Sequence, residues 1–329
     1  MRPIHSLLLA VALVSGCASA PRARDLPATE TWAFTAPWDA RSDASLRAHG
    51  AALRWAVTGW LALDTLTGQA TTPYPAESAQ SSALGGRRLA MVTTFAGGRF
   101  RPETIRLLAS DSGALRRTSS DIARRARSGG YSGLVLDLED VPRADSAALL
   151  AVSSALIRSA HDAGVAPIVI ALPATDSLGY PARRFPGADL FLVMLYDQHW
   201  ATSAPGPIAE PAWAQRVLAA RVAEIGAEKL VAGLPTYGYR WRAGEPFAET
   251  IGWSDAREIA SAAGVPLERD AGSLTLRAVS SAPPAWELWV SDAALVEALV
   301  RVVRDAGVWR VALWRLGLED PAMWVSGPR

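Results

Sequence analysis

The chain has 329 residues, a mass of 34.9 kDa and a formal net charge of +1, with 50% hydrophobic and 20% charged residues. This balance is typical of one or two globular domains with a large core. It excludes a largely disordered chain, which needs low hydrophobicity and high net charge. Arginines and acidic residues are interspersed, so we expect no basic surface and no nucleic-acid partner.

An apolar run at residues 7–14 lies near the N-terminus. It is too short for a permanent membrane-spanning helix, which needs about 20 apolar residues, and it matches the apolar part of a secretory signal. The run ends in Val14-Ser15-Gly16-Cys17, which resembles a bacterial lipobox, and this cysteine is the only one in the chain. We therefore expect residues 1–16 to be a lipoprotein signal peptide and Cys17 to carry the lipid.

Two other interpretations of this segment stay open. Ala18-Ser19-Ala20 resembles an ordinary signal-peptidase site, and a lone cysteine can also be a small buried core residue. Residues 17–30 are rich in alanine, proline and charge and lack apolar periodicity, which predicts a tether. With the lipid interpretation, we expect a location in the cell envelope, at the outer membrane or the periplasmic face in a Gram-negative cell. The lipid anchor would be the only contact with the membrane.

Apolar segments that recur along residues 31–329 predict strands, and helical patterns separate most of them. Several of the strand segments are apolar throughout, as expected for parallel strands buried on both faces. The strand segments are Trp32–Trp38, Trp55–Leu63, Leu89–Phe95, Gly133–Glu139, Pro167–Ala174, Leu190–Asp197, Leu230–Tyr237 and Trp309–Leu316. The helical segments are Ser42–Arg54, Ser119–Ser128, Ala144–Ala163, Ala212–Ile225 and Ala293–Ala306.

Eight strands alternating with helices predict an α/β fold, a (β/α)8 TIM barrel, for which about 250 residues are typical. A doubly wound parallel sheet is the alternative, although no Gly-x-Gly-x-x-Gly follows a strand. The stretch between the seventh and eighth strands is too long for one helix. It predicts a small α+β insertion at about residues 242–288, with a helix at Ser254–Ala263 and strands at Thr275–Val279 and Trp286–Val290.

The four histidines are scattered and show no spacing typical of metal ligands. We therefore expect neither a metal ion nor a cofactor. We also expect the protein to be a monomer.

The fourth predicted strand carries two carboxylates near its end, Asp137 and Glu139. Because strand side chains alternate, Val135, Asp137 and Glu139 share one face and the leucines take the other. Barrel enzymes place their catalytic groups at the carboxyl ends of the strands. Burial and mutual repulsion would raise the pKa of Glu139, which would let it act as a general acid near neutral pH. For an isolated Asp-x-Glu pair, capping of a following helix or pairing with arginine is the favoured interpretation, and the other strand ends change this balance.

Aromatic and acidic residues recur at the ends of other predicted strands. The sixth strand continues into Met-Leu-Tyr-Asp-Gln-His-Trp at 194–200, and the seventh contains Tyr237. The eighth contains Leu-Trp-Arg-Leu-Gly at 313–317, followed by Glu319-Asp320-Pro321. Aromatic rings stack on the apolar faces of sugars, and carboxylates handle protons and hydroxyl groups. The rim of the predicted barrel therefore indicates a carbohydrate site.

Together these segments resemble glycoside hydrolase family 18, the chitinase-like barrels. The motifs M-x-Y-D-Q-H-W and L-W-R-L-G-x-E-D-P occur in the right order over nearly the whole chain after the signal. The family signature D-x-x-D-x-D-x-E places its last aspartate at Asp137 and its glutamate at Glu139. Ser132 and Val135 stand where the family has its two earlier aspartates, so the chain departs from the full signature.

The resemblance implies hydrolysis in which the 2-acetamido oxygen of the substrate attacks the anomeric carbon, an exception to the two-carboxylate scheme. In that mechanism Glu139 protonates the glycosidic oxygen and then acts as a base for water. Asp137 orients the acetamido group and stabilises the cation that forms. Tyr196 would hydrogen-bond the acetamido carbonyl, and Asp197 would contact the same sugar.

The resemblance also implies that Trp314 forms the floor of the subsite in which the sugar distorts, with Tyr237 and Trp38 as wall residues. The expected function is an exported, membrane-anchored glycoside hydrolase that cleaves polysaccharide containing N-acetylhexosamine, namely β-linked N-acetylglucosamine. Peptidoglycan, chitin and an extracellular polysaccharide are all candidate substrates. The alternative is a non-catalytic, chitinase-like sugar-binding lipoprotein. Val135 supports this alternative, whereas Glu139 favours the enzyme, since a lectin needs no acid at a strand end.

Overall fold

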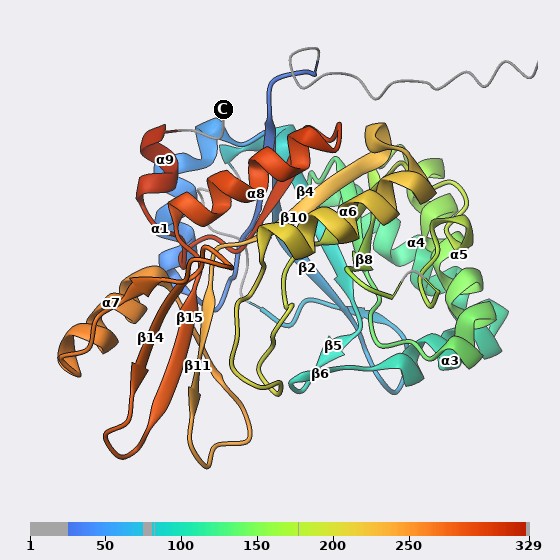
Figure 1. The fold of residues 1–329 in the computed structure, drawn as a ribbon. Coiled ribbons are helices and arrows are strands. Elements are labelled where there is room, and N and C mark those ends of the chain that lie inside the picture. The colour runs from blue at the N-terminus through green and yellow to red at the C-terminus, as the bar shows by residue number, and fades with distance from the viewer. Residues whose placement is uncertain (1–25, 75–80, 82, 177, 327–329) are drawn as a thin grey trace, which may run out of the picture.

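The computed structural model describes residues 26–74, 81, 83–176 and 178–326 (Figure 1). Eight parallel strands form a closed barrel, because β1 pairs with both β16 and β2. In chain order the barrel strands are β1 (Glu30–Phe34), β2 (Trp55–Leu63), β4 (Arg88–Thr93), β7 (Gly133–Asp137), β8 (Ile168–Pro173), β9 (Leu190–Met194), β10 (Leu230–Pro235) and β16 (Arg310–Trp314). The predicted (β/α)8 TIM barrel is confirmed.

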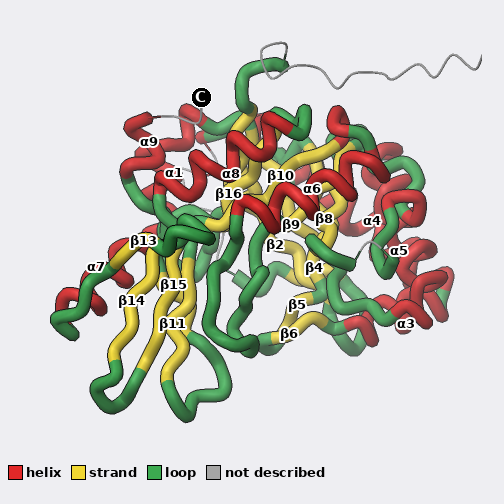
Figure 2. The backbone as a smooth tube through the Cα atoms, in the orientation of Figure 1, coloured by secondary structure: helices red, strands yellow, loops and turns green. Residues whose placement is uncertain are grey.

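Helices form a layer around the strands (Figure 2). They are α1 (Ala40–His49), α3 (Pro102–Ser110), α4 (Ser112–Ser128), α5 (Ser146–Asp162), α6 (Pro211–Ile225), α8 (Ala293–Asp305) and α9 (Ala322–Ser326). Short 3-10 helices cover Gly50–Ala52, Gly85–Arg87, Arg143–Asp145, Ala182–Arg184 and Ala227–Lys229. The helix α4 begins earlier than the predicted Ser119, because the Asp111 side chain accepts hydrogen bonds from the first free amides, those of Gly113 and Ala114.

The barrel strands bury both faces in different cores. Val135 packs inside the barrel with residues such as Met91 and Leu192, whereas Leu134 and Leu136 face the helix layer. The predicted alternation along this strand is therefore confirmed. It places every second side chain of β7 in the barrel interior, on a line that leads to the carboxyl end of the strand.

Several barrel strands end sooner than their apolar patterns predicted. The strand β7 ends at Asp137 and β9 at Met194, so Glu139, Tyr196 and Asp197 lie in the loops that follow. Backbone conformation accounts for part of the difference, because Asp140 and Asp197 have φ angles of 56° and 55°. This left-handed region is incompatible with a continuing strand. The site residues are therefore carried on tight loops directly above the barrel.

A five-stranded antiparallel sheet is inserted between β10 and α8, and it projects beside the barrel in Figure 1. Its elements are β11 (Gly238–Arg242), β12 (Glu249–Ile251), α7 (Trp253–Ala262), β13 (Glu268–Arg269), β14 (Leu276–Ser280) and β15 (Trp286–Val290). The sheet thus runs from Gly238 to Val290, beyond the expected 242–288, because β11 follows β10 almost directly. Ile251, Ala256 and Leu288 belong to its separate small core. Sequence patterns missed β11, β12 and β13.

Two further short pieces complete the fold. The strand β3 (Ala70–Thr71) pairs antiparallel with β2, and β5 (Phe95–Ala96) forms a hairpin with β6 (Arg99–Phe100). Within the described residues, no helix has both the length and the apolar character needed to span a bilayer. The apolar run 7–14, Cys17 and the tether as far as residue 25 lie outside the described residues, so the predictions made for them stay predictions.

Gly238, in the first strand of the insertion, lies so close to the backbone of β15 that we expect a larger residue there to destabilise the fold. A Cβ atom added at Gly238 would lie 2.1 Å from the carbonyl oxygen of Trp289 and 2.5 Å from the Cα atom of Val290. We expect Gly238→Ala to lower the free energy of unfolding by about 1–3 kcal/mol, because the paired backbone must move apart. Denaturant unfolding measures this loss. Gly272→Ala is the control, since its Cβ would meet only Asp270 Oδ1, at 3.5 Å. Equal losses in the two variants would contradict the explanation.

Candidate active site

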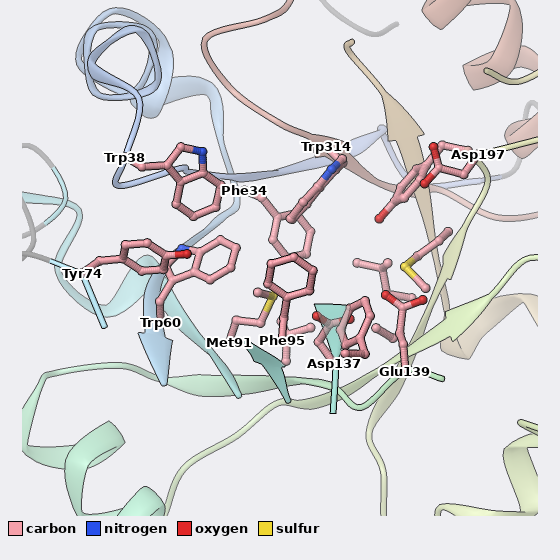
Figure 3. Close-up of a pocket in the computed structure, with 16 residues that line it drawn as sticks. Phe34, Trp38, Trp60, Tyr74, Met91, Phe95, Asp137, Glu139, Asp197 and Trp314 are labelled. Carbon is pink, nitrogen blue, oxygen red and sulfur yellow. The ribbon is translucent and has the colours of Figure 1, made fainter. Parts of the chain in front are cut away.

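A cavity of about 510 Å³ opens at the carboxyl end of the barrel strands (Figure 3). Its lining residues come from loops and strand ends far apart in the sequence. They are Phe34, Trp38, Trp60, Tyr74, Met91, Phe95, Phe100, Val135, Asp137, Glu139, Ala171, Leu192, Met194, Tyr196, Asp197 and Trp314. The structure therefore brings together Glu139, Asp137, Tyr196, Asp197, Trp314 and Trp38, all of which the sequence singled out.

The wall of this cavity is mainly apolar, and two hydrogen-bonded carboxyl groups, Asp137 and Glu139, lie in it. Burial raises the pKa of Asp137 to about 6, although hydrogen bonds from Thr93 and Glu139 act in the opposite direction. Burial also raises the pKa of Glu139 well above its usual value, and the negative charge of Asp137 adds to this. The pair therefore holds a proton at a pH where exposed carboxyl groups are ionised, with Glu139 as its stronger proton holder.

A buried tyrosine fixes the loop that carries Glu139. The hydroxyl group of Tyr180 donates to the carbonyl oxygen of Leu138 at 2.9 Å and accepts from the amide of Val141 at 2.8 Å. These two bonds span the left-handed residue Asp140. The glutamate is thus held between a strand end and a doubly bonded loop, which limits its freedom to turn away from the cavity.

Asp197 is held by two tyrosines that lie behind it. Tyr239 donates a hydrogen bond of 3.2 Å to Asp197 Oδ1, and Tyr237 donates to the same oxygen. Tyr237 is only 3% exposed and is not among the cavity-lining residues. It was expected as a wall residue, but it contributes through the carboxylate that it supports. Burial raises the pKa of Asp197, and the bonds from Tyr237 and Tyr239 counteract this.

Trp314 and Tyr196 form a nearly parallel aromatic pair beside the carboxyl groups. Their ring centroids are 6.4 Å apart with an interplanar angle of 18°, and Phe34 packs edge-on against Trp314 at 5.1 Å. Burial, with the nearby charges of Glu139 and Asp137, raises the pKa of Tyr196 well above its usual value. Its hydroxyl group therefore stays protonated and can donate a hydrogen bond to a ligand.

A second aromatic group lies at the opposite end of the cavity from Glu139 and Asp197 (Figure 3). Trp38 contacts Trp60 and Tyr74, with ring centroids 4.9 Å apart in both pairs, and half of its surface is exposed. Sequence analysis expected Trp38 in a strand, but β1 ends at Phe34 and Trp38 lies in the loop before α1. It did not single out Trp60 or Tyr74. The position of Trp60 inside a predicted strand was the available signal for the former.

Other residues near the rim are structural. Glu319 accepts hydrogen bonds from the amide of Gly317 and the hydroxyl group of Ser45, and Asp320 accepts from the amide of Ala293. They belong to the motif that drew attention to the eighth strand, but they support loops away from the cavity. Over the described part of the chain, no group of three or more His, Cys, Asp or Glu side chains is arranged to hold a metal ion.

Comparison with known proteins finds relatives in sequence and in fold. The protein assigned as a sporulation-specific glycosylase, YdhD, from Bacillus subtilis (strain 168) is 27% identical over 252 residues, which is 72% of this chain and 59% of that protein. The chain thus spans about three fifths of the length of this curated relative. A class V chitinase from Pseudomonas fluorescens Pf-5 superimposes with a TM-score of 0.79 and 25% identity, covering 91% of this chain and 98% of the other.

These similarities support a chitinase-like domain of glycoside hydrolase family 18. A class V chitinase variant from Nicotiana tobaccum, solved in complex with NAG4, shares the fold of this domain with a TM-score of 0.69 and 16% identity, over 92% of this chain and 98% of the other. No model of a protein family matches the sequence.

The buried carboxyl pair gives the chitinase-like domain a testable pH dependence of stability. The pKa of Asp137 is about 6 in the folded chain against 3.8 as its ordinary value, so the folded chain binds more protons between these values. Stability must then fall as the pH rises through this window. We expect Asp137→Asn to raise the free energy of unfolding at pH 7 by on the order of 1–3 kcal/mol. The gain should shrink below a pH of about 6 and vanish near 4.

Asp111→Asn is the matched control for this prediction. Hydrogen bonds from the amides of Ala114 and Gly113 lower the pKa of Asp111, so its ionised form favours the folded chain. Its neutralisation should therefore give no stabilisation at pH 7. Thermal unfolding from pH 4 to pH 8 compares the two variants. A loss of stability at pH 7 in Asp137→Asn, or an effect independent of pH, would contradict the assignment of a raised pKa.

Proposed function

We propose that this protein is a glycoside hydrolase that cleaves polysaccharides containing β-linked N-acetylglucosamine, by substrate-assisted hydrolysis with retention of configuration. One observation carries the proposal. Glu139 is a cavity-lining carboxyl group whose pKa is raised by burial and by Asp137, which is the state that a general acid needs near neutral pH.

The spacing of the carboxyl groups favours a nucleophile supplied by the substrate. Glycosidases with two independent carboxylates keep them about 5–5.5 Å apart when retaining and about 6.5–9.5 Å apart when inverting. Asp137 and Glu139 instead lie close enough to shift each other's pKa, by charge and by a side-chain hydrogen bond, so they act as one unit and not as two independent groups. In both of those schemes the two carboxyl groups flank the scissile bond from separate positions, which a pair in mutual contact does not do. The 2-acetamido group of the substrate is then the available nucleophile.

The proposed reaction has two steps, and Glu139 changes role between them. In the first step Glu139 gives its proton to the glycosidic oxygen, the bond to the leaving sugar breaks, and the acetamido oxygen bonds to the anomeric carbon. The resulting oxazolinium cation lies beside Asp137, whose carboxylate stabilises the positive charge. In the second step the Glu139 carboxylate takes a proton from water, whose oxygen displaces the acetamido oxygen. Two displacements at one carbon retain its configuration.

The aromatic residues of the cavity suit a sugar with this group. Trp314 offers a flat apolar face next to the carboxyl pair, and Tyr196 can donate a hydrogen bond to the acetamido carbonyl oxygen. The complex of the tobacco chitinase variant with NAG4 supports a substrate class built from N-acetylglucosamine. Peptidoglycan and chitin both contain this sugar, and the proposal covers the shared linkage.

We also propose that the enzyme acts from the cell envelope, exported by the signal at residues 1–16 and held by a lipid on Cys17. The support is the apolar run 7–14 followed by Val-Ser-Gly-Cys. A tether that starts at residue 17 and ends before β1 begins at Glu30 would let the barrel stand away from the membrane, at most about 45 Å.

The proposed acid predicts a specific loss. Glu139→Gln removes the transferable proton but keeps the shape of the side chain, so hydrolysis of N-acetylglucosamine oligomers should fall by about 10²–10⁴-fold while their binding persists. The measurement is product formation by chromatography with affinity by calorimetry. De-N-acetylated oligomers are the matched substrate control, since they lack the attacking oxygen and should not be cleaved by the parent protein.

Three outcomes of this experiment separate the candidate functions. Cleavage by the parent protein alone supports the enzyme. Binding without cleavage in both proteins would indicate the alternative, a non-catalytic sugar-binding protein, for which the valine at position 135 is the motivating observation. Cleavage of the de-N-acetylated oligomers would contradict the role of the substrate as nucleophile.

The anchor has its own test. Cells that express the protein and receive a palmitate label should yield a labelled chain, and Cys17→Ser should abolish the label because the acceptor thiol is gone. Ser15→Ala is a control, because it keeps a small residue at that position and leaves Gly16 and Cys17 unchanged. Equal labelling of parent and Cys17→Ser would contradict the anchor.

A further inference from the structure

Asp137 has a neighbour on the adjacent strand that the family resemblance does not point to. In the parallel pairing of β4 with β7, Thr93 lies directly opposite Asp137, and Met91 lies opposite Val135. The Thr93 hydroxyl group is 3.1 Å from Asp137 Oδ2 and donates to it. Both residues are buried, with exposures of 3% and 8%. The contact follows from strand register and is a fixed feature of the barrel wall.

The direction of the Thr93 hydroxyl proton is set by a second bond. The backbone amide of Phe95 donates to Thr93 Oγ1 at 3.0 Å. That bond occupies a lone pair of the oxygen, so the single hydroxyl proton remains for Asp137. A β-branched side chain on a strand is also stiff at χ1. Thr93 is therefore held as a donor aimed at one carboxylate oxygen.

The groups around Asp137 explain why the hydrogen bond from Thr93 matters for its ionisation. Where the family signature has a carboxyl group at position 135, this chain has Val135, which is fully buried and lines the cavity. The charged or titratable groups that act on the pair are all acidic or phenolic: Asp140 from the same loop, and Asp197 and Tyr196 from the loop after β9. Asp140 disfavours an ionised Asp137, Asp197 disfavours an ionised Glu139, and the ionised form of Tyr196 is itself disfavoured by both carboxyl groups. The neutral donor Thr93 on β4 acts in the opposite direction, as does the hydrogen bond from Glu139.

We propose that Thr93 is a positioning residue for Asp137, which holds this carboxyl group toward the reacting sugar and stabilises its ionised form in a chain that has valine at position 135. The proposal deepens the proposed hydrolase function and rests on it for its catalytic consequence. Thr93 touches no substrate atom in this scheme and acts through Asp137.

The same two bonds connect the carboxyl pair to a part of the cavity wall. Phe95, whose amide orients Thr93, begins the hairpin of β5 with β6, and its ring packs on Phe100 at a centroid distance of 5.2 Å. Both rings line the cavity, and Phe95 is 41% exposed. A sugar that contacts this hairpin would therefore contact the segment whose backbone amide orients Thr93, and through Thr93 it would act on Asp137.

The test compares two replacements of the hydroxyl group with one that keeps it. Thr93→Val is nearly isosteric and removes the donor, Thr93→Ala is a second variant without the hydroxyl, and Thr93→Ser retains it. Loss of a hydrogen bond to a charged group should lower kcat on N-acetylglucosamine oligomers by about 10–100-fold in the valine and alanine variants. The acidic limb of the kcat profile should move to higher pH in them, because the pKa of Asp137 rises without the donor. Thr93→Ser should keep both values near those of the parent.

A readout independent of activity separates this proposal from the proposed function. The Asp137 carboxyl carbon is followed by NMR during a pH titration of the full chain labelled at its aspartates and assigned with Asp137→Asn. A higher titration midpoint in Thr93→Val and Thr93→Ala, but not in Thr93→Ser, supports the role of Thr93 even if the parent cleaves no oligomer tested. Unchanged midpoints and pH profiles in the variants without the hydroxyl would overturn it, as would a serine variant that behaves like the valine variant.

Discussion

The chemistry of the site depends on one constraint, the burial of two interacting carboxyl groups at the mouth of an otherwise apolar barrel. Asp137 and Glu139 lose hydration and repel each other, so the pair keeps a proton that solvent-exposed carboxylates would release. The apolar wall around them, which includes Val135 and Trp314, is therefore part of the chemistry. It supplies the low dielectric that raises the pKa of the acid and strengthens its interaction with a developing cation.

Burying charge in this way opposes folding, and the surrounding structure offsets that cost with rigid supports. Tyr180 bridges the loop after β7, and Tyr237 and Tyr239 hold Asp197 after β9. Both loops contain an aspartate in the left-handed backbone region, Asp140 or Asp197. Such strain concentrates where a site must present side chains at a fixed angle. The barrel strands form the stable part of the structure, and the loops after β7 and β9 fix the positions of the site side chains.

The sequence predicted the barrel because long apolar strands and amphipathic helices have distinct periodicities. It predicted the carboxyl pair because alternation along the expected strand Gly133–Glu139 puts both groups on one face, although β7 itself ends at Asp137. It could not predict which residues from other strands meet that pair. Thr93 becomes a neighbour of Asp137 only through the β4–β7 register, and Tyr74 reaches the cavity from a loop without a repeating pattern. Short strands such as β12 and β13 were not predicted, because two or three residues are too few to show a periodic pattern. Tyr237 was expected in the wall, but it supports Asp197 from behind.

The role of Glu139 as proton donor depends on a pKa that burial beside Asp137 raises well above that of an exposed carboxyl group. A titration of its carboxyl carbon by NMR, in protein labelled at glutamate carboxyl groups, tests this most directly. Burial next to Asp137 predicts a midpoint well above the ordinary value of 4.5. A midpoint at or below that value would mean that the carboxyl group is hydrated and ionised. The account of Glu139 as the proton donor would then be wrong.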